Sequence, residues 1–406
     1  MRILHTADWH LGQHLCDKDR DEEHRLFLEF LIEKIHENEI DILIIAGDIF
    51  DNANPPNASL RQYYNFLKSL TSSPCKHTII IGGNHDSVST LNAPRALLQS
   101  FNISVFGGVT ADLQDEIVPV KDATGKQIAT ICAVPFLRDR DIRTAVAGEL
   151  YGEREKRIKE GMRSHYSTVA DLAQQATPAS LPIIATGHLF AAGSRGADSE
   201  KDIHLGNLGQ ISADAFPDIF DYVALGHLHR PQMVGGLKKI RYSGSPIPLS
   251  FSEIDDQKQL LLVEFNGKKL VAVTPIPVPI SRRLMRFKGS ISAVKTAIEL
   301  FEKKDYKLKC WAEVQLEMDN FTPDADEQVR AFAQDKELEI LKVSAKYTTG
   351  KLSLAEQEEV PDLSELNVNE VFARKCESLH LSETDQRELS ALFTELLAAM
   401  EEEKAQ

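Results

Sequence analysis

Short apolar runs alternate with longer amphipathic segments over residues 1–275. In Arg25–Asn38 the apolar side chains recur at helical spacing, and Ser59–Leu70 and Thr90–Phe101 also predict helices. Strands that alternate with helices predict a layered α/β domain. The apolar runs that predict strands are Arg2–His5, Asp41–Ala46, Thr78–Gly82, Ile128–Val134, Pro182–Thr186, Tyr222–Leu225 and Leu260–Phe265.

The pattern changes after residue 275, where Val273–Ile280 contains three prolines and predicts an extended linker. Residues 281–348 then alternate strand and helix patterns and predict a small α+β domain. A polar, acidic stretch at Thr348–Pro361 predicts a second linker. Residues 362–406 predict two helices with pronounced apolar faces, so we expect three parts: 1–275, 281–348 and 362–406.

The net charge of −15 at first argues against a nucleic acid as partner. However, Lys351–Gln406 holds 14 acidic and 5 basic residues, so −9 of this charge belongs to the tail and −6 to the rest. The charge therefore does not exclude DNA, and it gives no support for it. No apolar run approaches the roughly 18 residues of a membrane span, and the five cysteines form no Cys-x-x-Cys pair. We expect a cytoplasmic protein with scattered thiols.

Five short polar clusters each follow a predicted strand. Taken singly, each is typical of a turn, a helix cap or a buried ion pair. Taken together, they fit one site, because open α/β sheets bind ligands beyond the carboxyl ends of their strands. The clusters are Asp8-Trp9-His10, Gly47-Asp48, Gly83-Asn84-His85-Asp86, Gly187-His188 and Gly226-His227-Leu228-His229.

These clusters supply seven potential metal ligands, and their oxygen and imidazole donors suit manganese, iron or zinc. Seven ligands exceed what one octahedral ion needs, whereas two ions that share a carboxylate use them all. Two ions about 3.5–4 Å apart can stabilise both the attacking and the leaving oxygen of a phosphoryl transfer. Asp48 is the expected bridge, because it follows the most apolar strand. The seven ligands are Asp8, His10, Asp48, Asn84, His188, His227 and His229.

The order of these clusters resembles the calcineurin-like metallophosphoesterase superfamily. Within it, the words His5-Thr6-Ala7-Asp8-Trp9-His10, Ala46-Gly47-Asp48-Ile49-Phe50-Asp51 and Tyr242-Ser243-Gly244-Ser245-Pro246 resemble the bacterial SbcD family of nucleases. The resemblance implies a four-layer αββα sandwich with a small α+β capping domain and C-terminal helices. It covers the whole catalytic region.

The resemblance also implies roles for individual residues. One ion would be held by Asp8, His10, Asp48 and His229, and the other by Asp48, Asn84, His188 and His227. His85 corresponds to the family's catalytic histidine, which protonates the leaving oxygen or stabilises charge in the transition state. Asp86 is the expected residue to orient His85. Asp51 stands where many relatives carry a second active-site histidine, which leaves that second role open.

The implied function is that of a manganese-dependent DNA nuclease in repair, recombination and replication. Its activities would be a 3′-to-5′ exonuclease on double strands and an endonuclease on single strands or hairpins. The chain has no Walker-type loop, so ATP hydrolysis would come from an SbcC-type ATPase bound by the C-terminal helices. These helices could instead pack on their own catalytic domain. The family further implies a homodimer within a heterotetramer, formed through Ser59–Leu70 and Thr90–Phe101.

Contacts to DNA are predicted less directly. Basic residues lie around the last two clusters, where they could bind phosphates or belong to an ordinary solvated surface. A dimetal phosphatase or cyclic-nucleotide phosphodiesterase is the alternative enzyme, and a non-enzymatic scaffold is the alternative of another class. The basic residues are Arg195, Lys201, Arg230, Lys238, Lys239 and Arg241.

Overall fold

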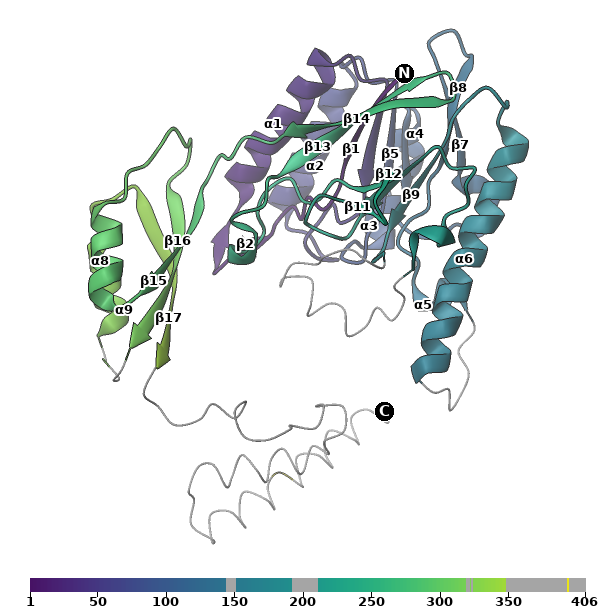
Figure 1. Ribbon diagram of the computed structural model, residues 1–406. Helices are drawn as coiled ribbons and strands as arrows, with labels where there is room; N and C mark the ends of the chain where they lie inside the picture. The colour runs from purple at the N-terminus through teal and green to yellow at the C-terminus, as the bar shows by residue number, and fades with distance from the viewer. Residues whose placement is uncertain (144–150, 192–210, 319–321, 323, 348–392, 394–406) are drawn as a thin grey trace. The chain divides into compact units, whose positions relative to one another are not determined.

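The computed structural model describes residues 1–143, 151–191, 211–318, 322, 324–347 and 393. Two mixed six-stranded sheets form the larger part of the described chain, and a three-stranded sheet forms a smaller part (Figure 1). The chain is thus an α/β protein, and its mixed sheets are consistent with the metallophosphoesterase fold.

The first sheet contains the strands that carry the first three polar clusters. Strands β1, β4, β5 and β6 run parallel to one another, and β13 pairs with β1 in the antiparallel direction. In sheet order the strands are β14 (Lys269–Pro277), β13 (Gln259–Asn266), β1 (Arg2–Thr6), β4 (Ile42–Ala46), β5 (His77–Ile81) and β6 (Ile103–Phe106).

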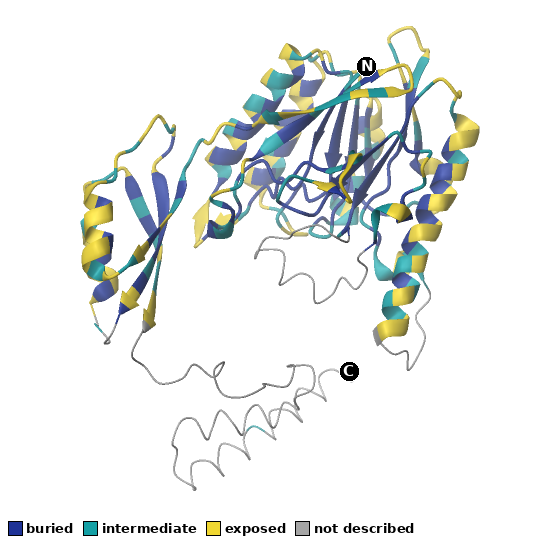
Figure 2. Ribbon diagram, in the orientation of Figure 1, coloured by how far each residue is buried: buried dark blue, intermediate teal, exposed yellow. Residues whose placement is uncertain are grey.

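Strand β4 shows why this sheet is covered on both faces. All five of its residues are buried, as in a parallel strand packed on two sides. Leu43 and Ile45 pack against helices α1 (Asp21–Glu37) and α2 (Asn57–Leu70), whereas alternate residues such as Ile44 pack toward the second sheet. Figure 2 shows that the strands of these sheets are largely buried, whereas the helices combine buried and exposed positions.

The second sheet carries the last two clusters. Strands β8, β9, β10 and β12 run parallel to one another, and the edge strands β7 and β11 pair with β8 and β12 in the antiparallel direction. The order is β11 (Gln232–Val234), β12 (Leu237–Tyr242), β10 (Tyr222–Gly226), β9 (Ile183–His188), β8 (Gln127–Cys132) and β7 (Ile117–Lys121).

Helix α6 (Tyr151–Ala176) covers the outer face of the second sheet, and the sequence patterns did not predict it. Its apolar positions are interrupted by long polar stretches, yet Ile158, Met162, Tyr166 and Val169 still fall on one buried face. Tertiary packing therefore stabilises a helix whose sequence is polar on most of its surface.

Shorter elements connect these layers. The single helix predicted at Thr90–Phe101 is two helices, because Pro94 cannot donate the hydrogen bond that would continue the first. These elements are β2 (His14–Leu15), β3 (Lys18–Asp19), α3 (Val88–Asn92), α4 (Arg95–Gln99), α5 (Asp139–Ile142) and the 3₁₀ turns η1 (Leu113–Glu116), η2 (Ala213–Ala215) and η3 (Phe251–Glu253).

The prediction of a linker at Val273–Ile280 was wrong for most of these residues. Strand β14 continues to Pro277 and pairs with β13 through Pro275↔Leu261 and Pro277↔Gln259. A proline cannot donate to a neighbouring strand, and β14 lies at the sheet edge. Prolines two residues apart present their nitrogens to the same side, so both can face the open edge.

The smaller part agrees with the predicted α+β pattern after residue 281. Strands β15 (Leu284–Gly289), β16 (Cys310–Met318) and β17 (Leu338–Tyr347) form the sheet, and α8 (Ile291–Glu299) and α9 (Ala325–Phe332) accompany it. Val294, Val314 and Val329 belong to its own hydrophobic core. The predicted C-terminal helices lie outside the described residues. Among the helices that are described, none is long and apolar enough to cross a membrane.

The close approach of β4 and β10 gives a first prediction. A Cβ atom added at Gly226 would lie 1.9 Å from the carbonyl oxygen of Ala46. We expect Gly226→Ala to lower the free energy of unfolding by about 2–3 kcal/mol, because backbone would have to move. Chemical denaturation in EDTA measures this without a contribution from metal. Gly152→Ala is the matched control, since a Cβ there meets nothing within 4 Å. Equal stability of the two variants would contradict the packing of these strands.

Candidate metal centre

All seven predicted ligands follow strands whose carboxyl ends meet between the two sheets. Asp8 and His10 follow β1, Asp48 follows β4, and Asn84 follows β5. The second sheet supplies His188 at the end of β9, and His227 and His229 after β10. Six of the seven are buried, and Asn84 is half-buried.

Two compact groups of side chains come together at this junction. Asp8, His10 and Asp48 form one group, and Asp48, His188 and His227 form the other. Within each group the ligand atoms lie within 4.8 Å of one another. The two groups share Asp48, which is consistent with a dimetal site. The ring of His229 lies 5.1 Å from that of His10, next to the first group.

Four residues at the site have a backbone conformation that residues other than glycine rarely adopt. Asp8, His10, Asp48 and His227 have φ angles of 55°, 49°, 49° and 101°. Such left-handed conformations cost free energy for residues other than glycine and cluster at functional sites. Gly83 is required here for another reason, since a Cβ would lie 2.2 Å from Asp48 Oδ1. The chain thus accepts local strain to bring the ligands together.

The donor atoms fit bound cations. Asp8 Oδ2 and His10 Nε2 are buried and have no hydrogen-bond partner among the described residues. His188 Nε2 lies 3.0 Å from both Asp48 Oδ2 and Asn84 Oδ1, which can only accept hydrogen bonds. His188 Nδ1 is 2.9 Å from the carbonyl of Ala46 and must carry its proton there. A neutral His188 therefore turns a lone pair toward two oxygens, an arrangement that a cation would stabilise.

Oxygen atoms next to the Nδ1 atoms of two histidines determine that Nε2 faces the candidate metal centre. Asp51 Oδ1 lies 3.2 Å from His10 Nδ1, and Glu253 Oε1 lies 3.3 Å from His229 Nδ1. Such partners set the tautomer and orientation of metal-binding imidazoles. The sequence marked Asp51 only as a departure from the family pattern. It gave no signal for Glu253 or for the carbonyl of Ala46, because neither belongs to a motif.

The carboxylates create a strongly negative potential at the centre. Burial alone lowers the pKa of His10 and His188, but the neighbouring Asp48 and, for His10, the bond to Asp51 raise both to about 9. Burial alone raises the pKa of Asp48, yet the charges of His188 and His10 bring it well below its usual range. The same potential that favours a proton on imidazole favours a divalent cation in its place.

His85 lies beside the two groups without belonging to either. Its ring is 4.9 Å from that of His10, and its backbone N–H donates to Asp48 Oδ1 at 2.9 Å. His85 Nδ1 donates to the carbonyl oxygen of Asp51 at 2.7 Å, so Nε2 carries the free lone pair in the neutral ring.

The expected contact between Asp86 and the His85 ring is not the one that the structure shows. The Asp86 carboxylate is buried and accepts the backbone N–H groups of Ile49, Phe50 and Gly83 at 2.9–3.1 Å. Backbone donors from two ligand loops outcompete a neighbouring side chain in orienting this carboxylate. Asp86 therefore joins those loops, and the carbonyl of Asp51 orients His85.

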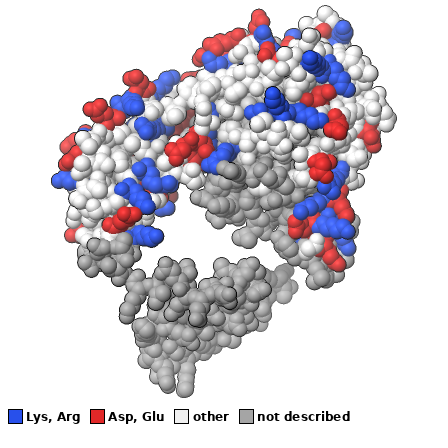
Figure 3. Space-filling model, viewed as in Figure 1, with Lys and Arg blue, Asp and Glu red and all other residues white. Residues whose placement is uncertain are grey.

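Two of the basic residues singled out in the sequence form ion pairs with acidic side chains. Arg230 pairs with Asp256 at 2.9 Å, and Lys239 pairs with Asp218 at 3.3 Å. Arg195 and Lys201 lie outside the described residues. Basic and acidic side chains are interspersed on the described surface drawn in Figure 3. These residues alone do not define a nucleic-acid interface.

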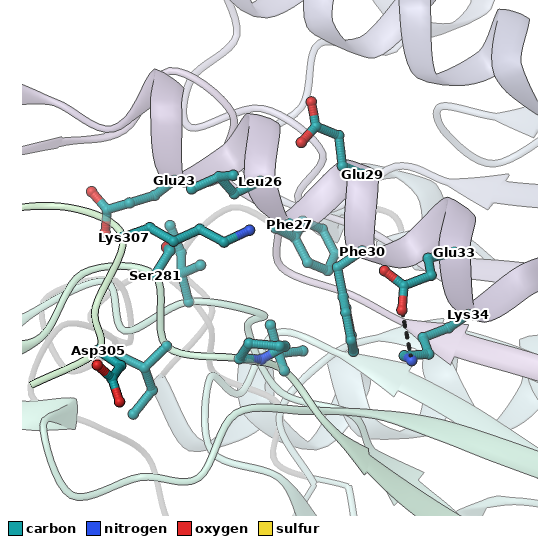
Figure 4. Close-up of a pocket in the computed structure, with 14 residues that line it drawn as sticks. Glu23, Leu26, Phe27, Glu29, Phe30, Glu33, Lys34, Ser281, Asp305 and Lys307 are labelled. Carbon is teal, nitrogen blue, oxygen red and sulfur yellow. Dashed lines mark hydrogen bonds and ion pairs between the residues drawn. The ribbon is translucent and has the colours of Figure 1, made fainter.

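A separate pocket of about 420 Å³ lies beside α1, and none of its lining residues is a predicted ligand (Figure 4). Phe27 and Phe30 of α1 line it, with Pro279 and Lys307. An open cleft of about 550 Å³ lies instead at His85. It is lined by Asn84, His85, Ser87, Ser89, Arg138 and Arg140, among others.

Comparison with known proteins agrees with this geometry. Residues 1–231 match the calcineurin-like phosphoesterase family, and residues 281–379 match the family described as the Type 5 capsule protein repressor C-terminal domain. The fold and the paired acidic and histidine groups thus define a metallophosphoesterase.

Curated relatives make the family more specific. The chain is 37% identical over 398 residues to the SbcD chain of the SbcCD nuclease of Escherichia coli K12, covering 98% of each protein. It is 38% identical over 288 residues to the SbcD protein of Rhodobacter capsulatus, covering 69% of this chain and 70% of the relative. The SbcD protein of Bacillus subtilis is 28% identical over 321 residues, 78% of this chain and 79% of the relative. The chain belongs to the SbcD family of nucleases, as the strand-end motifs predicted.

The sharing of Asp48 by the two groups predicts an unequal effect of substitutions on metal content. Asp48→Asn should reduce bound Mn²⁺ from two ions per chain to at most one, because it weakens both groups. His227→Ala should remove one ion only. Elemental analysis after dialysis against Mn²⁺ measures the content, with Asp112→Asn as an exposed acidic control. Two ions retained by Asp48→Asn would contradict the shared role.

Proposed function

We propose that the chain is a manganese-dependent DNA nuclease that works with an SbcC-type ATPase. The observation that carries this proposal is the pair of buried ligand groups that share Asp48 beside a free face of His85. Family membership supports a nucleic acid as the substrate, since the relatives are named nucleases. We also propose the αββα arrangement of four layers as the framework that holds the two groups together.

The proposed ligand sets follow the two compact groups. Asp8, His10, Asp48 and His229 would hold one ion, and Asp48, Asn84, His188 and His227 the other. When bound, two divalent ions supply charge stabilisation to the oxygens of an in-line phosphoryl displacement and help deprotonate the attacking water. The protein would bind the ions through neutral imidazoles. The oxygens that lie next to Nδ1 of His10, His188 and His229 support this, because they hold the ring proton on Nδ1 and leave Nε2 to bind metal.

His85 is the proposed general acid of the reaction. Its Nδ1 proton is committed to the carbonyl of Asp51, so its Nε2 can carry a second proton to the departing ribose oxygen. Asp51 would thus replace the missing second histidine with a different role. Its carboxylate orients His10 and its carbonyl orients His85, so one residue links the metal ligands to the acid.

The open cleft beside His85 supports a polyanionic substrate. Arg140 exposes 79% of its side chain there, and Arg138 lies beside the carbonyl of Asp86 at 3.4 Å. Guanidinium groups at this position would contact phosphates that flank the scissile bond, which supplies affinity without sequence preference. A small phosphomonoester or cyclic nucleotide has no flanking phosphates to make such contacts. This distinction separates a nuclease from the alternative phosphatase.

The proposed assembly is a homodimer of this chain within a heterotetramer. Tyr64 on α2, Leu97 on α4 and Phe101 just beyond it expose 39%, 64% and 52% of their surface, which supports a contact in this region. We propose the three-part division at 1–275, 281–348 and 362–406, with the ATPase contact in the last part. The names of the relatives, as parts of SbcCD, support this partner.

Replacement of His85 tests the proposed chemistry. His85→Ala should lower cleavage of linear and hairpin DNA by about 10²–10⁴-fold, the usual contribution of a general acid. The test uses Mn²⁺ and the SbcC-type partner. The variant should still bind two ions, because His85 belongs to neither ligand group. His14→Ala, which changes an exposed histidine, is the control. Normal cleavage by His85→Ala would rule out the proposed role.

The two arginines test the substrate class. Arg138→Ala/Arg140→Ala should lower DNA cleavage about tenfold at moderate salt and reduce the slope of log affinity against log salt by about 1–2. Hydrolysis of bis(p-nitrophenyl) phosphate should stay unchanged, since this small diester needs only the metal centre. Arg25→Ala on α1 is the control for a general loss of positive charge. An equal loss on both substrates would argue for a structural effect instead.

A further inference from the structure

Glu253 has a fully buried carboxylate and belongs to none of the sequence motifs. It lies in the 3₁₀ turn η3, 24 residues beyond His229 in the chain. Oε1 lies 3.3 Å from His229 Nδ1. Oε2 accepts hydrogen bonds from Lys258 Nζ at 2.6 Å and from the backbone N–H of Leu249 at 3.2 Å. Both carboxylate oxygens are therefore committed to fixed partners.

Lys258 binds the backbone of the same histidine. Its ammonium group is buried and donates to the carbonyl oxygen of His229 at 3.0 Å and to Ser245 Oγ at 2.9 Å. The backbone N–H of Ser245 also donates to the His229 carbonyl, at 3.1 Å. The ring and the backbone of His229 are thus held by one buried ion pair.

A buried ion pair is weak support for stability, because the cost of desolvation offsets much of the attraction. The role of the Glu253–Lys258 pair therefore lies in the residue that it positions. Glu253 and Lys258 both contact His229, which is a predicted metal ligand. The geometry therefore favours a role in the metal centre.

The turn that carries Glu253 is itself anchored. The carbonyl oxygen of Phe251 accepts a hydrogen bond from Arg286 of β15 at 2.9 Å, and Arg286 pairs with Glu313 of β16 at 2.8 Å. Phe251 also packs with Leu284 and Trp311. Support of this kind fixes the position of a residue that orients a ligand.

We propose that Glu253, held by Lys258, is a positioning residue that keeps the His229 ring in the Nδ1–H tautomer with Nε2 directed to the metal centre. The proposal rests on His229 being a metal ligand, as proposed above. Glu253 itself touches neither metal nor substrate. Loss of the Glu253 carboxylate should weaken the binding of one metal ion and leave the affinity for the other unchanged.

Mn²⁺ titration of the full chain by calorimetry provides the first test. Glu253→Gln keeps the shape but removes the charge, and it should weaken one of the two Mn²⁺ sites by about 10–100-fold, the usual effect of losing such a partner. The other site should change by less than about threefold. Ser252→Ala, in the same turn, is the matched control and should bind like the wild type.

The double variant Glu253→Gln/Lys258→Met removes the lysine charge that the single variant leaves unpaired. It should show the same loss at one site, with thermal unfolding in EDTA reporting that it folds. Wild-type affinity at both sites in a folded variant would overturn the proposal. Equal weakening of both sites would do the same, because it would indicate a general structural role.

A measurement on the wild type covers the case in which the variants do not fold. Nitrogen-15 spectra of the histidine rings, recorded without metal and with His229→Gln to assign the signal, report the tautomer of His229. A neutral ring protonated at Nδ1 is expected, and a ring protonated at Nε2 would overturn the proposal. Failure of the wild-type chain to bind two Mn²⁺ ions would contradict the proposed function and leave this tautomer result as the separate test of Glu253.

Discussion

The constraint on which the rest depends is the burial of Asp48 among histidines at the junction of two sheets. A carboxylate removed from water needs compensating charge, and Asp8 is buried close by with the same requirement. Two divalent ions bound at this junction would supply that charge, and they would account for the nitrogens and oxygens that face one another across short distances. The strained backbone at Asp8, His10, Asp48 and His227 is the structural cost of bringing these atoms together.

The fold makes this junction possible because each sheet contributes its own loops. The first sheet supplies the carboxylates, Asn84 and His10, and the second supplies the remaining three histidines. The group of Asp8, His10 and Asp48 comes from the first sheet alone, whereas the other group also needs His188 and His227 of the second sheet. The packing of β4 against β10 therefore sets how the two groups lie relative to each other. Asp86 adds to this by joining two ligand loops of the first sheet through backbone N–H groups.

Much of this could be predicted from the sequence, since strand-end clusters of metal-binding residues are local patterns. The strands and the ligands are adjacent in the chain: the apolar runs indicate the strands, and the residue types that directly follow them indicate the ligands. Contacts between distant segments could not be predicted in this way. Glu253 is held against His229 by tertiary packing, and Asp86 accepts backbone N–H groups in place of a contact with the neighbouring ring. Helix α6 is stabilised by the sheet that it covers, and the prolines of β14 are tolerated only because that strand lies at an edge.

The central claim is that two metal ions share Asp48. Anomalous diffraction at the manganese edge, from crystals of the chain grown with Mn²⁺, tests it most directly. Two peaks about 3.5–4 Å apart are expected, each within bonding distance of an Asp48 oxygen. A single peak, or two peaks of which only one touches Asp48, would contradict this claim.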